Sequence, residues 1–227
     1  MSYDPRTIAF LAEVIYQPLN LKAEAVQTIH NQLYGQTEIS YQNFQVAADG
    51  IHLTNVPERP GAVSAVSFTP DRMVVREELR ATTVEDFATR LVNVTGLALR
   101  TLGVQATIAQ QFVVRSLVSP RHAADSREFV LRKVFSAEDS VWSCFERPMQ
   151  RVGLAFTFPQ TEGHDHVFNV RIETWNQDPR SLWIENVGSF TKPIPVDRAP
   201  DLSNLLFATY GFATKQVTAF LEQFDKA

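Results

Sequence analysis

The stretch "RVGLAFTFPQTEGHDHVFNVRIETWNQDPRSLWIENVGSF", residues 151–190, decides the fold class. Apolar and polar residues alternate within 151–158, 167–175 and 181–187, a period typical of β-strands that bury one face. The connection 176–180 is short enough for a hairpin between the second and third of these strands. The stretch therefore predicts an antiparallel sheet.

Two long amphipathic helices are predicted elsewhere in the chain. Residues 84–102 carry apolar side chains every three or four positions, with a capping-box spacing at Thr83 and Asp86, and residues 202–224 carry a similar stripe. We expect an α+β fold with a mostly antiparallel sheet, both helices packed beside each other on one face, and the other face as the candidate functional surface.

The N-terminal half supplies further elements. Residues 8–18 read as a strand that ends at Pro18, and a helix over 21–35 is expected with Asn20 as its N-cap. Asp49-Gly50 predicts a hairpin with a type I′ turn.

The order strand, helix, antiparallel strands, long helix occurs twice along the chain. This order predicts an internal duplication, with a first unit at 1–104 and a second at 105–227, fused into one compact domain. The ordinary alternative is that many α+β proteins share such an order without a duplication.

Composition limits the possible partners and compartments. The 227 residues are 44% hydrophobic, carry a net charge of −4 and contain no run of Lys or Arg, so nucleic acid is not an expected partner. The single cysteine, Cys144, allows no intrachain disulfide, which fits a reducing cytoplasm, and its neighbours predict a buried small side chain. No signal peptide or membrane span is predicted.

Two short segments carry a resemblance to a known family. "AEVIYQP" (12–18) begins a strand with a Glu-Val step, and "FVVRSLVSP" (112–120) is an Arg-containing strand after the mid-chain helix. In these features and in element order the chain resembles a sporadically distributed bacterial family of uncharacterised, duplicated α+β proteins. The resemblance implies a bacterial protein and implies no activity or cofactor.

His164 and His166 are the candidate metal ligands. In an extended strand they point to the same face, and imidazole suits a transition metal. No histidine follows His166, and Glu173 is too far along the chain for a cupin-like spacing. The other interpretation, which we favour, is a polar hairpin tip between Pro159 and the next strand.

A second constellation lies on one face of the predicted sheet. If Trp175 pairs with Trp183, then Glu173 pairs with Glu185, above a floor of small residues from the neighbouring strand. The face would carry these six side chains: Arg151, Arg171, Glu173, Trp175, Trp183 and Glu185. Like charges directly opposite each other are unfavourable, which argues for Arg171 between the glutamates or for another register.

Three interpretations of this face compete. It is an ordinary solvated sheet face, a protein–protein surface anchored by Trp and Arg, or a concave ligand site in which Glu173 and Glu185 perform acid–base chemistry. Phosphate-binding loops, dinucleotide fingerprints and Gly-x-Ser-x-Gly elbows are absent from the sequence.

These observations define two function classes. The first is a non-catalytic ligand-binding or protein-binding module, self-associating and without cofactor, that uses this sheet face. The alternative is a hydrolase that uses a metal held by His164 and His166, or the Glu173/Glu185 pair.

Overall fold

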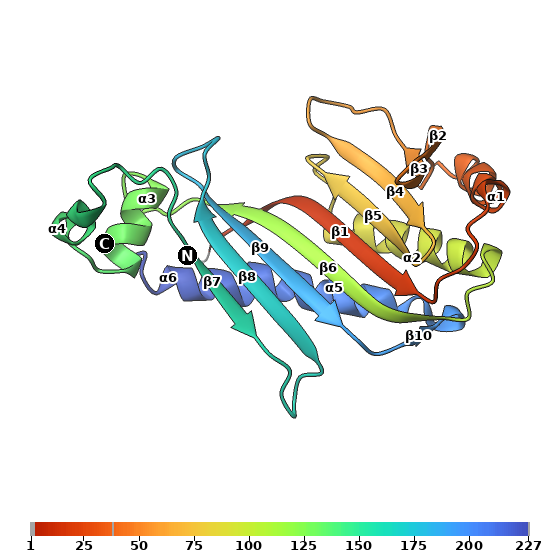
Figure 1. Cartoon of the computed structure of the whole chain (residues 1–227). Helices are drawn as coiled ribbons and strands as arrows, with labels where there is room; N and C mark the ends of the chain where they lie inside the picture. The colour runs from red at the N-terminus through yellow and green to blue at the C-terminus, as the bar shows by residue number, and fades with distance from the viewer. Residues whose placement is uncertain (1–2, 38, 227) are drawn as a thin grey trace.

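The computed structural model describes residues 3–37 and 39–226, except for the side chain of Asp139. The chain has the predicted α+β fold, built on one antiparallel sheet with long helices behind it (Figure 1). The strands follow the order β2-β3-β4-β5-β1-β6-β9-β8-β7, and a further short strand, β10, pairs with β6.

The described part of the N-terminal half contains seven helices and strands. They are β1 (Arg6–Tyr16), α1 (Ala23–Tyr34), β2 (Asn43–Ala47), β3 (Gly50–Thr54), β4 (Val63–Thr69), β5 (Arg72–Glu78) and α2 (Val84–Thr101). Thr83 caps α2 as predicted, because its hydroxyl accepts a hydrogen bond from the Asp86 backbone N–H at 3.1 Å.

The C-terminal half begins with β6 (Ala106–Val118). Short helical pieces follow: α3 (Ser126–Glu128), a π-helical segment (Phe129–Val134), α4 (Asp139–Trp142) and a 3-10 turn (Ser143–Phe145). Next come β7 (Gly153–Phe158), β8 (His166–Thr174), β9 (Leu182–Phe190), β10 (Ile194–Pro195) and a 3-10 turn (Val196–Arg198). The last helix consists of α5 (Asp201–Gly211), a π-helical segment (Phe212–Val217) and α6 (Thr218–Glu222).

The two halves meet where β1 pairs with β6, in the middle of the sheet. On either side of this pair the arrangement is similar, because β5 pairs with β1 and β9 pairs with β6. The similarity is what a duplicated unit would give. The duplication itself, with its boundary near residue 104, stays a prediction.

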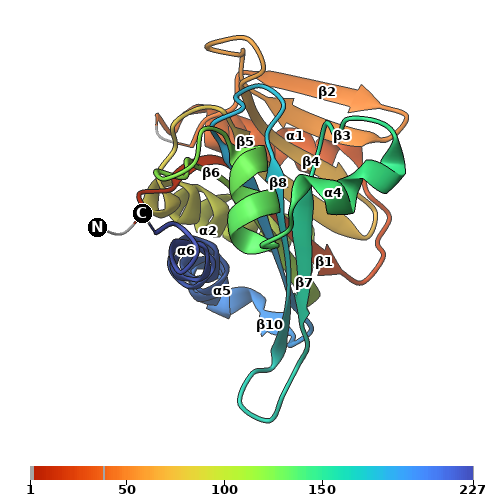
Figure 2. The same ribbon diagram turned by 90° about the vertical axis from the view of Figure 1, so that its left-hand side faces the viewer.

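Both long helices lie on the same face of the sheet, as predicted. α2 and α5 contact each other there, and the two views agree on their position beside the strands (Figures 1 and 2). The core lies between these helices and the sheet, where the ring of Phe10 stacks on Phe87 with centroids 5.1 Å apart. The opposite face of the sheet is called the open face below.

Two local predictions about the N-terminal half are wrong. Lys22, not Asn20, is the N-cap of α1, and no side chain caps this helix. The β2–β3 hairpin forms, but Ala47 pairs with Gly50, so residues 48–49 make the turn. Gly50 begins β3 with φ 146°, and a Cβ there would lie 2.6 Å from the Phe68 carbonyl oxygen, so this glycine allows strands to approach closely instead of forming a type I′ turn.

Candidate functional site

The pairing of β8 with β9 decides how the predicted site residues meet. Trp183 lies opposite Glu173, and Glu185 lies opposite Arg171. The predicted pairs Trp175–Trp183 and Glu173–Glu185 are therefore wrong by two residues. Trp175 instead donates its backbone N–H to Ser181 across the end of the hairpin, at 3.0 Å. A displacement of two residues keeps every side chain on its predicted face, because the side-chain period of a strand is two.

Arg171 separates the two glutamates on the open face. Its guanidinium lies 2.5 Å from Oε1 of Glu173 and 3.8 Å from Oε1 of Glu185. Arg151, just before β7, approaches Glu173 at 3.4 Å from the other side. This arrangement removes the like-charge opposition that the predicted register would have created.

The charged row continues across the centre of the sheet. Arg115 of β6 contacts Glu185 at 2.8 Å and Glu78 of β5 at 3.3 Å, and Glu78 also contacts Arg76 at 2.8 Å. We call the whole row the arginine–glutamate ladder; its members in spatial order are Arg76, Glu78, Arg115, Glu185, Arg171, Glu173 and Arg151. Each exposed pair of this kind contributes about 0.2–1 kcal/mol.

Sequence patterns did not identify Arg115 and Glu78 as part of this surface. The alternation in "FVVRSLV" places Arg115 in a strand, but a strand without a known neighbour gives no face and no partner. Only the pairing of β6 with both β1 and β9 brings Arg115 to the ladder.

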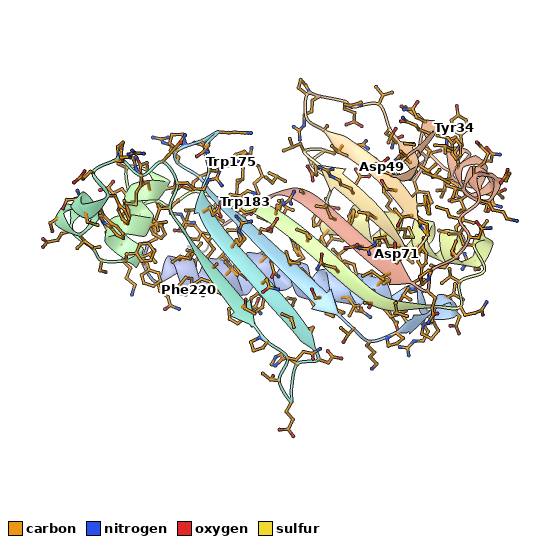
Figure 3. The ribbon with its side chains drawn as sticks, in the orientation of Figure 1. Tyr34, Asp49, Asp71, Trp175, Trp183 and Phe220 are labelled. Atoms are coloured by element: carbon orange, nitrogen blue, oxygen red, sulfur yellow. The ribbon has the colours of Figure 1, made fainter. Side chains whose placement is uncertain are left out.

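Trp183 lies on the open face near the start of β9. The Arg171 guanidinium lies 5.6 Å from the centre of its ring system, and that of Arg115 lies 5.9 Å from it. These distances are those of cation–π contacts, which hold the indole between the two arginines. Trp175 lies near Trp183 at the end of the sheet where β8 ends and β9 begins (Figure 3).

Five of the six predicted site residues line one cavity of about 320 Å³. These five are Arg151, Arg171, Glu173, Trp175 and Trp183, together with Thr174, Asn176 and Gln177. Glu185 does not line this cavity; it contacts Arg171 and Arg115.

The floor of small residues is present beside the ladder. Gly153 lies opposite Glu173, and Ala155 lies opposite Arg171. A Cβ on Gly153 would lie 2.9 Å from Cγ of Glu173 and 2.3 Å from the Ile172 carbonyl oxygen, so the close approach requires a glycine.

The ladder geometry bears on the predicted acid–base pair. That prediction rested on two carboxylates directly opposite each other, and the register separates them. Each carboxylate also contacts two guanidinium groups: Arg171 and Arg151 for Glu173, Arg115 and Arg171 for Glu185. Both carboxylates are thus already paired with arginines, and the geometry does not place them together as an acid–base pair.

His164 and His166 lie at the hairpin tip between β7 and β8. Thr161 and His164 exchange backbone hydrogen bonds of 2.9 and 3.0 Å around Gly163, which closes the tip. The two rings are 5.8 Å apart, and His166 packs on Phe168 at 4.5 Å. Within residues 3–37 and 39–226, no three His, Cys, Asp or Glu side chains group as metal ligands do.

Cys144 differs from its prediction. It is exposed, and its Sγ lies 3.5 Å from the carbonyl oxygen of Val141 in the same short helical region. The prediction failed because Phe145, which was expected to bury this segment, is itself 57% exposed.

Comparisons with known proteins add little to this geometry. No family model matches the chain, and no curated protein matches it. The crystal structure of the regulatory subunit of aspartate kinase from Thermus flavus is similar at a TM-score of 0.25 and 11% identity, over 92% of this chain and 97% of that chain. A similarity at this level carries no argument about fold or function, and the resemblance to a bacterial family stays a prediction.

A helix crosses a membrane only if it is long and apolar along its whole length. Within the described part of the chain, no helix combines enough length and apolar character to cross a membrane.

Proposed function

We propose that the chain is a non-catalytic binding module whose ligand binds on the open face, at the cavity beside Trp183. The observation that carries this proposal is the position of Trp183, held between Arg115 and Arg171 at the wall of that cavity. Trp and Arg are the side chains that most often anchor binding surfaces.

The charges of the cavity indicate the chemistry of its ligand. Arg151 and Arg171 share one carboxylate, Glu173, so the cavity wall keeps one net positive charge. Both arginine side chains are more than half exposed, at 58% and 51%, and have N–H groups available to a ligand. A group that combines a flat ring with a carboxylate, from a small molecule or a peptide segment, would stack on Trp175 and pair with the guanidinium groups.

Tryptophan fluorescence provides a direct test. Trp142, the only tryptophan outside the cavity, is replaced in a Trp142→Phe background, so that the emission comes from Trp175 and Trp183. The probes are aromatic carboxylates and tryptophan-free Phe-Asp peptides, each with its neutral amide as a control. We expect saturable quenching by the acids and not by the amides.

Two arginine variants separate specific binding from a change in net charge. Arg171→Ala should weaken the affinity roughly tenfold, because a cavity-facing charged contact is lost. Arg76→Ala removes the same charge at the far end of the ladder, outside the cavity, and should leave the affinity unchanged. Absence of saturable quenching with every probe, or equal loss in both variants, would reject the proposal.

A hydrolase remains the second candidate class, without an observation that favours it. Glu173 and Glu185 are engaged by arginines, and the His164–His166 pair has no third ligand grouped with it among the described residues. Metal analysis of the purified protein tests this class. A stoichiometric transition metal that is lost in the His164→Ala/His166→Ala double variant would overturn our preference.

The remaining proposals concern cellular context. We keep the sequence-based expectations of a bacterial cytoplasmic protein that self-associates and does not bind nucleic acid. Of these expectations, self-association is the one that the fold makes testable.

A further inference from the structure

β7 forms one edge of the sheet, and its backbone defines which hydrogen-bonding groups point outward. The carbonyl of Val152 accepts the N–H of Thr174 in β8 at 3.0 Å, so residue 152 points toward β8. In an antiparallel strand this direction alternates from one residue to the next. Leu154 and Phe156 therefore also point toward β8. The N–H and C=O groups of Gly153, Ala155 and Thr157 point outward, away from the sheet.

The side chains of β7 alternate between the two faces of the sheet. Gly153, Ala155 and Thr157 lie on the open face, and Leu154 and Phe156 lie on the helix face. Between Arg151 and Pro159 the strand carries no charge and no proline. Natural edge strands usually carry such residues, because they prevent pairing with another chain.

An apolar groove lies beside this edge on the helix face. It has a volume of about 440 Å³, and Figure 3 places one of its residues, Phe220, on the last helix, away from the two tryptophans. The groove is lined by Phe156, Phe158, Val170, Ile172, Phe212, Gln216, Val217 and Phe220. Phe158, at the end of β7, is 43% exposed. Figure 2 looks onto this end of the molecule, where β7 runs beside the last helix.

We infer that β7 pairs antiparallel with β7 of a second copy of this chain, around a two-fold axis at Ala155. In this register Ala155 lies opposite Ala155 of the second copy, and Gly153 lies opposite Thr157. All the outward N–H and C=O groups of these three residues then form hydrogen bonds within the pair. The next pair would oppose Arg151 and Pro159. Because proline has no N–H, the pairing ends there.

The same register matches the side chains. On the helix face Leu154 lies opposite Phe156 of the second copy, and Val152 lies opposite Phe158, so apolar side chains meet apolar side chains along the whole pair. On the open face only Gly, Ala and Thr meet. A two-fold interface requires a surface that is complementary to itself, and β7 has this property in both hydrogen bonding and polarity.

Other registers lose part of this match. A shift of one residue along either strand would place the apolar face of one copy on the open face of the other. A two-fold axis at Phe156 would place Gly153 opposite Pro159, which has no N–H, and would leave the Gly153 carbonyl without a donor. Only the register at Ala155 pairs the outward groups of Gly153, Ala155 and Thr157 entirely with one another, within the bounds of β7.

The molar mass in solution tests the pairing. One chain has a mass of 25.6 kDa, and light scattering during gel filtration should give twice this value at micromolar concentrations. Ala155→Pro removes an outward N–H and leaves the bonds to β8 in place, so it should convert the dimer to a monomer with an unchanged circular dichroism spectrum. A monomeric wild-type protein, or a folded Ala155→Pro variant that remains dimeric, would overturn the inference.

Cross-linking tests the register without relying on the proline variant. In a Cys144→Ser background, Ala155→Cys should be joined to its counterpart by a short bismaleimide, because paired Cα atoms lie about 5.5 Å apart. Thr157→Cys is the matched control. The two cysteine side chains at position 157 of a pair would be offset by four residues, roughly 13 Å along the strands, which is farther than the same reagent can span. Cross-linking at 157 and not at 155 would show another register and would reject the one inferred.

The pairing is independent of the ligand proposed for the open face. Dilution of the wild-type protein to its monomer should leave the quenching of Trp175 and Trp183 unchanged, whereas Arg171→Ala should leave the molar mass unchanged. Failure of one inference therefore does not imply failure of the other.

Discussion

Ala9 lies directly between Glu78 and Arg115 in the sheet, paired with Glu78 of β5 on one side and with Arg115 of β6 on the other. Paired residues share a face, so all three side chains lie on the open face. The small methyl group of Ala9, only 4% exposed, leaves room for Arg115 to reach Glu78 at 3.3 Å. The ladder thus crosses the junction between the two halves of the chain through an alanine.

Ala9→Leu should break the ladder at this junction. A larger side chain would separate Arg115 from Glu78 and overpack the site, at a cost of about 1–3 kcal/mol in the free energy of unfolding. Urea denaturation measures this cost. Ala109→Leu, on the same face of β6 and half-buried outside the ladder, is the control and should change the stability by less than about 0.5 kcal/mol. Equal costs at both positions would contradict a specific role for Ala9.

Gly188 of β9 determines how closely the last helix approaches the sheet. A Cβ there would lie 2.4 Å from Oγ1 of Thr209 and 3.0 Å from the ring of Phe168. Asn186 fixes the same helix by donating its side-chain N–H to the Thr209 carbonyl at 2.8 Å. Gly188→Ala should therefore lower the free energy of unfolding by about 1–3 kcal/mol.

Thr209→Ala should recover part of that loss, because it removes the nearest atom. A double-mutant cycle in urea should give a coupling of at least about 0.5 kcal/mol between the two positions. Additive effects would show that the clash with Thr209 does not set the cost.

Glu77 is a buried carboxylate among positive charges. It is 2% exposed, accepts a hydrogen bond from Ser64 at 2.7 Å, and lies 3.3 Å from Arg90 and 3.6 Å from Arg80. Glu77→Ala would leave two partly buried guanidinium groups without this partner, at a cost of about 3–5 kcal/mol. Chemical denaturation should show a cost below about 1 kcal/mol for the control Glu58→Ala, since Glu58 contacts Arg80 at the surface. A small effect of Glu77→Ala would mean that the cluster is not a stabilising element.

Asp225 connects the C-terminal end to two distant segments. Its carboxylate accepts hydrogen bonds from the Tyr3 hydroxyl at 2.5 Å and from the backbone N–H groups of Arg121 and His122 at 2.8 and 2.9 Å. Partial burial opposes the charged form, but these hydrogen bonds outweigh it and hold the pKa of Asp225 below its ordinary value of 3.8.

The lowered pKa gives a pH dependence of defined sign. A carboxyl group whose folded pKa lies below its unfolded pKa adds stability above the unfolded value, and this stability is lost as the pH falls through the folded pKa. The difference in unfolding free energy between wild type and Asp225→Asn should therefore shrink as the pH is lowered from 5 toward 2 (roughly the range over which such a group titrates). Tyr3→Phe, which removes one donor, should reduce this difference. A difference that is independent of pH would contradict the assignment.

Much of the fold followed from periodicity in the sequence. Alternation in 167–175 and 181–187 determined that Arg171 and Glu173 share a face with Trp183 and Glu185, because the face of a strand residue depends only on its parity. The same kind of local signal, apolar spacing with a cap at Thr83, predicted α2. These properties depend on a few neighbouring residues and need no knowledge of distant parts of the chain.

The pairing register of the strands, and which strands lie next to each other, could be learned only from the tertiary structure. A hairpin can shift by two residues without moving any side chain to the other face, so the sequence could not exclude a register with Glu173 opposite Glu185. In the structure Arg171 lies opposite Glu185, and this pairing of opposite charges favours the observed register. The partners of Arg115 depend on which strands lie beside β6, and these strands are far from it in the sequence: Glu185 of β9, for example, is 70 positions from Arg115. The sequence determined which side chains face the same way, and only the packed sheet decided which of them touch, because contact between strands is a property of long-range pairing.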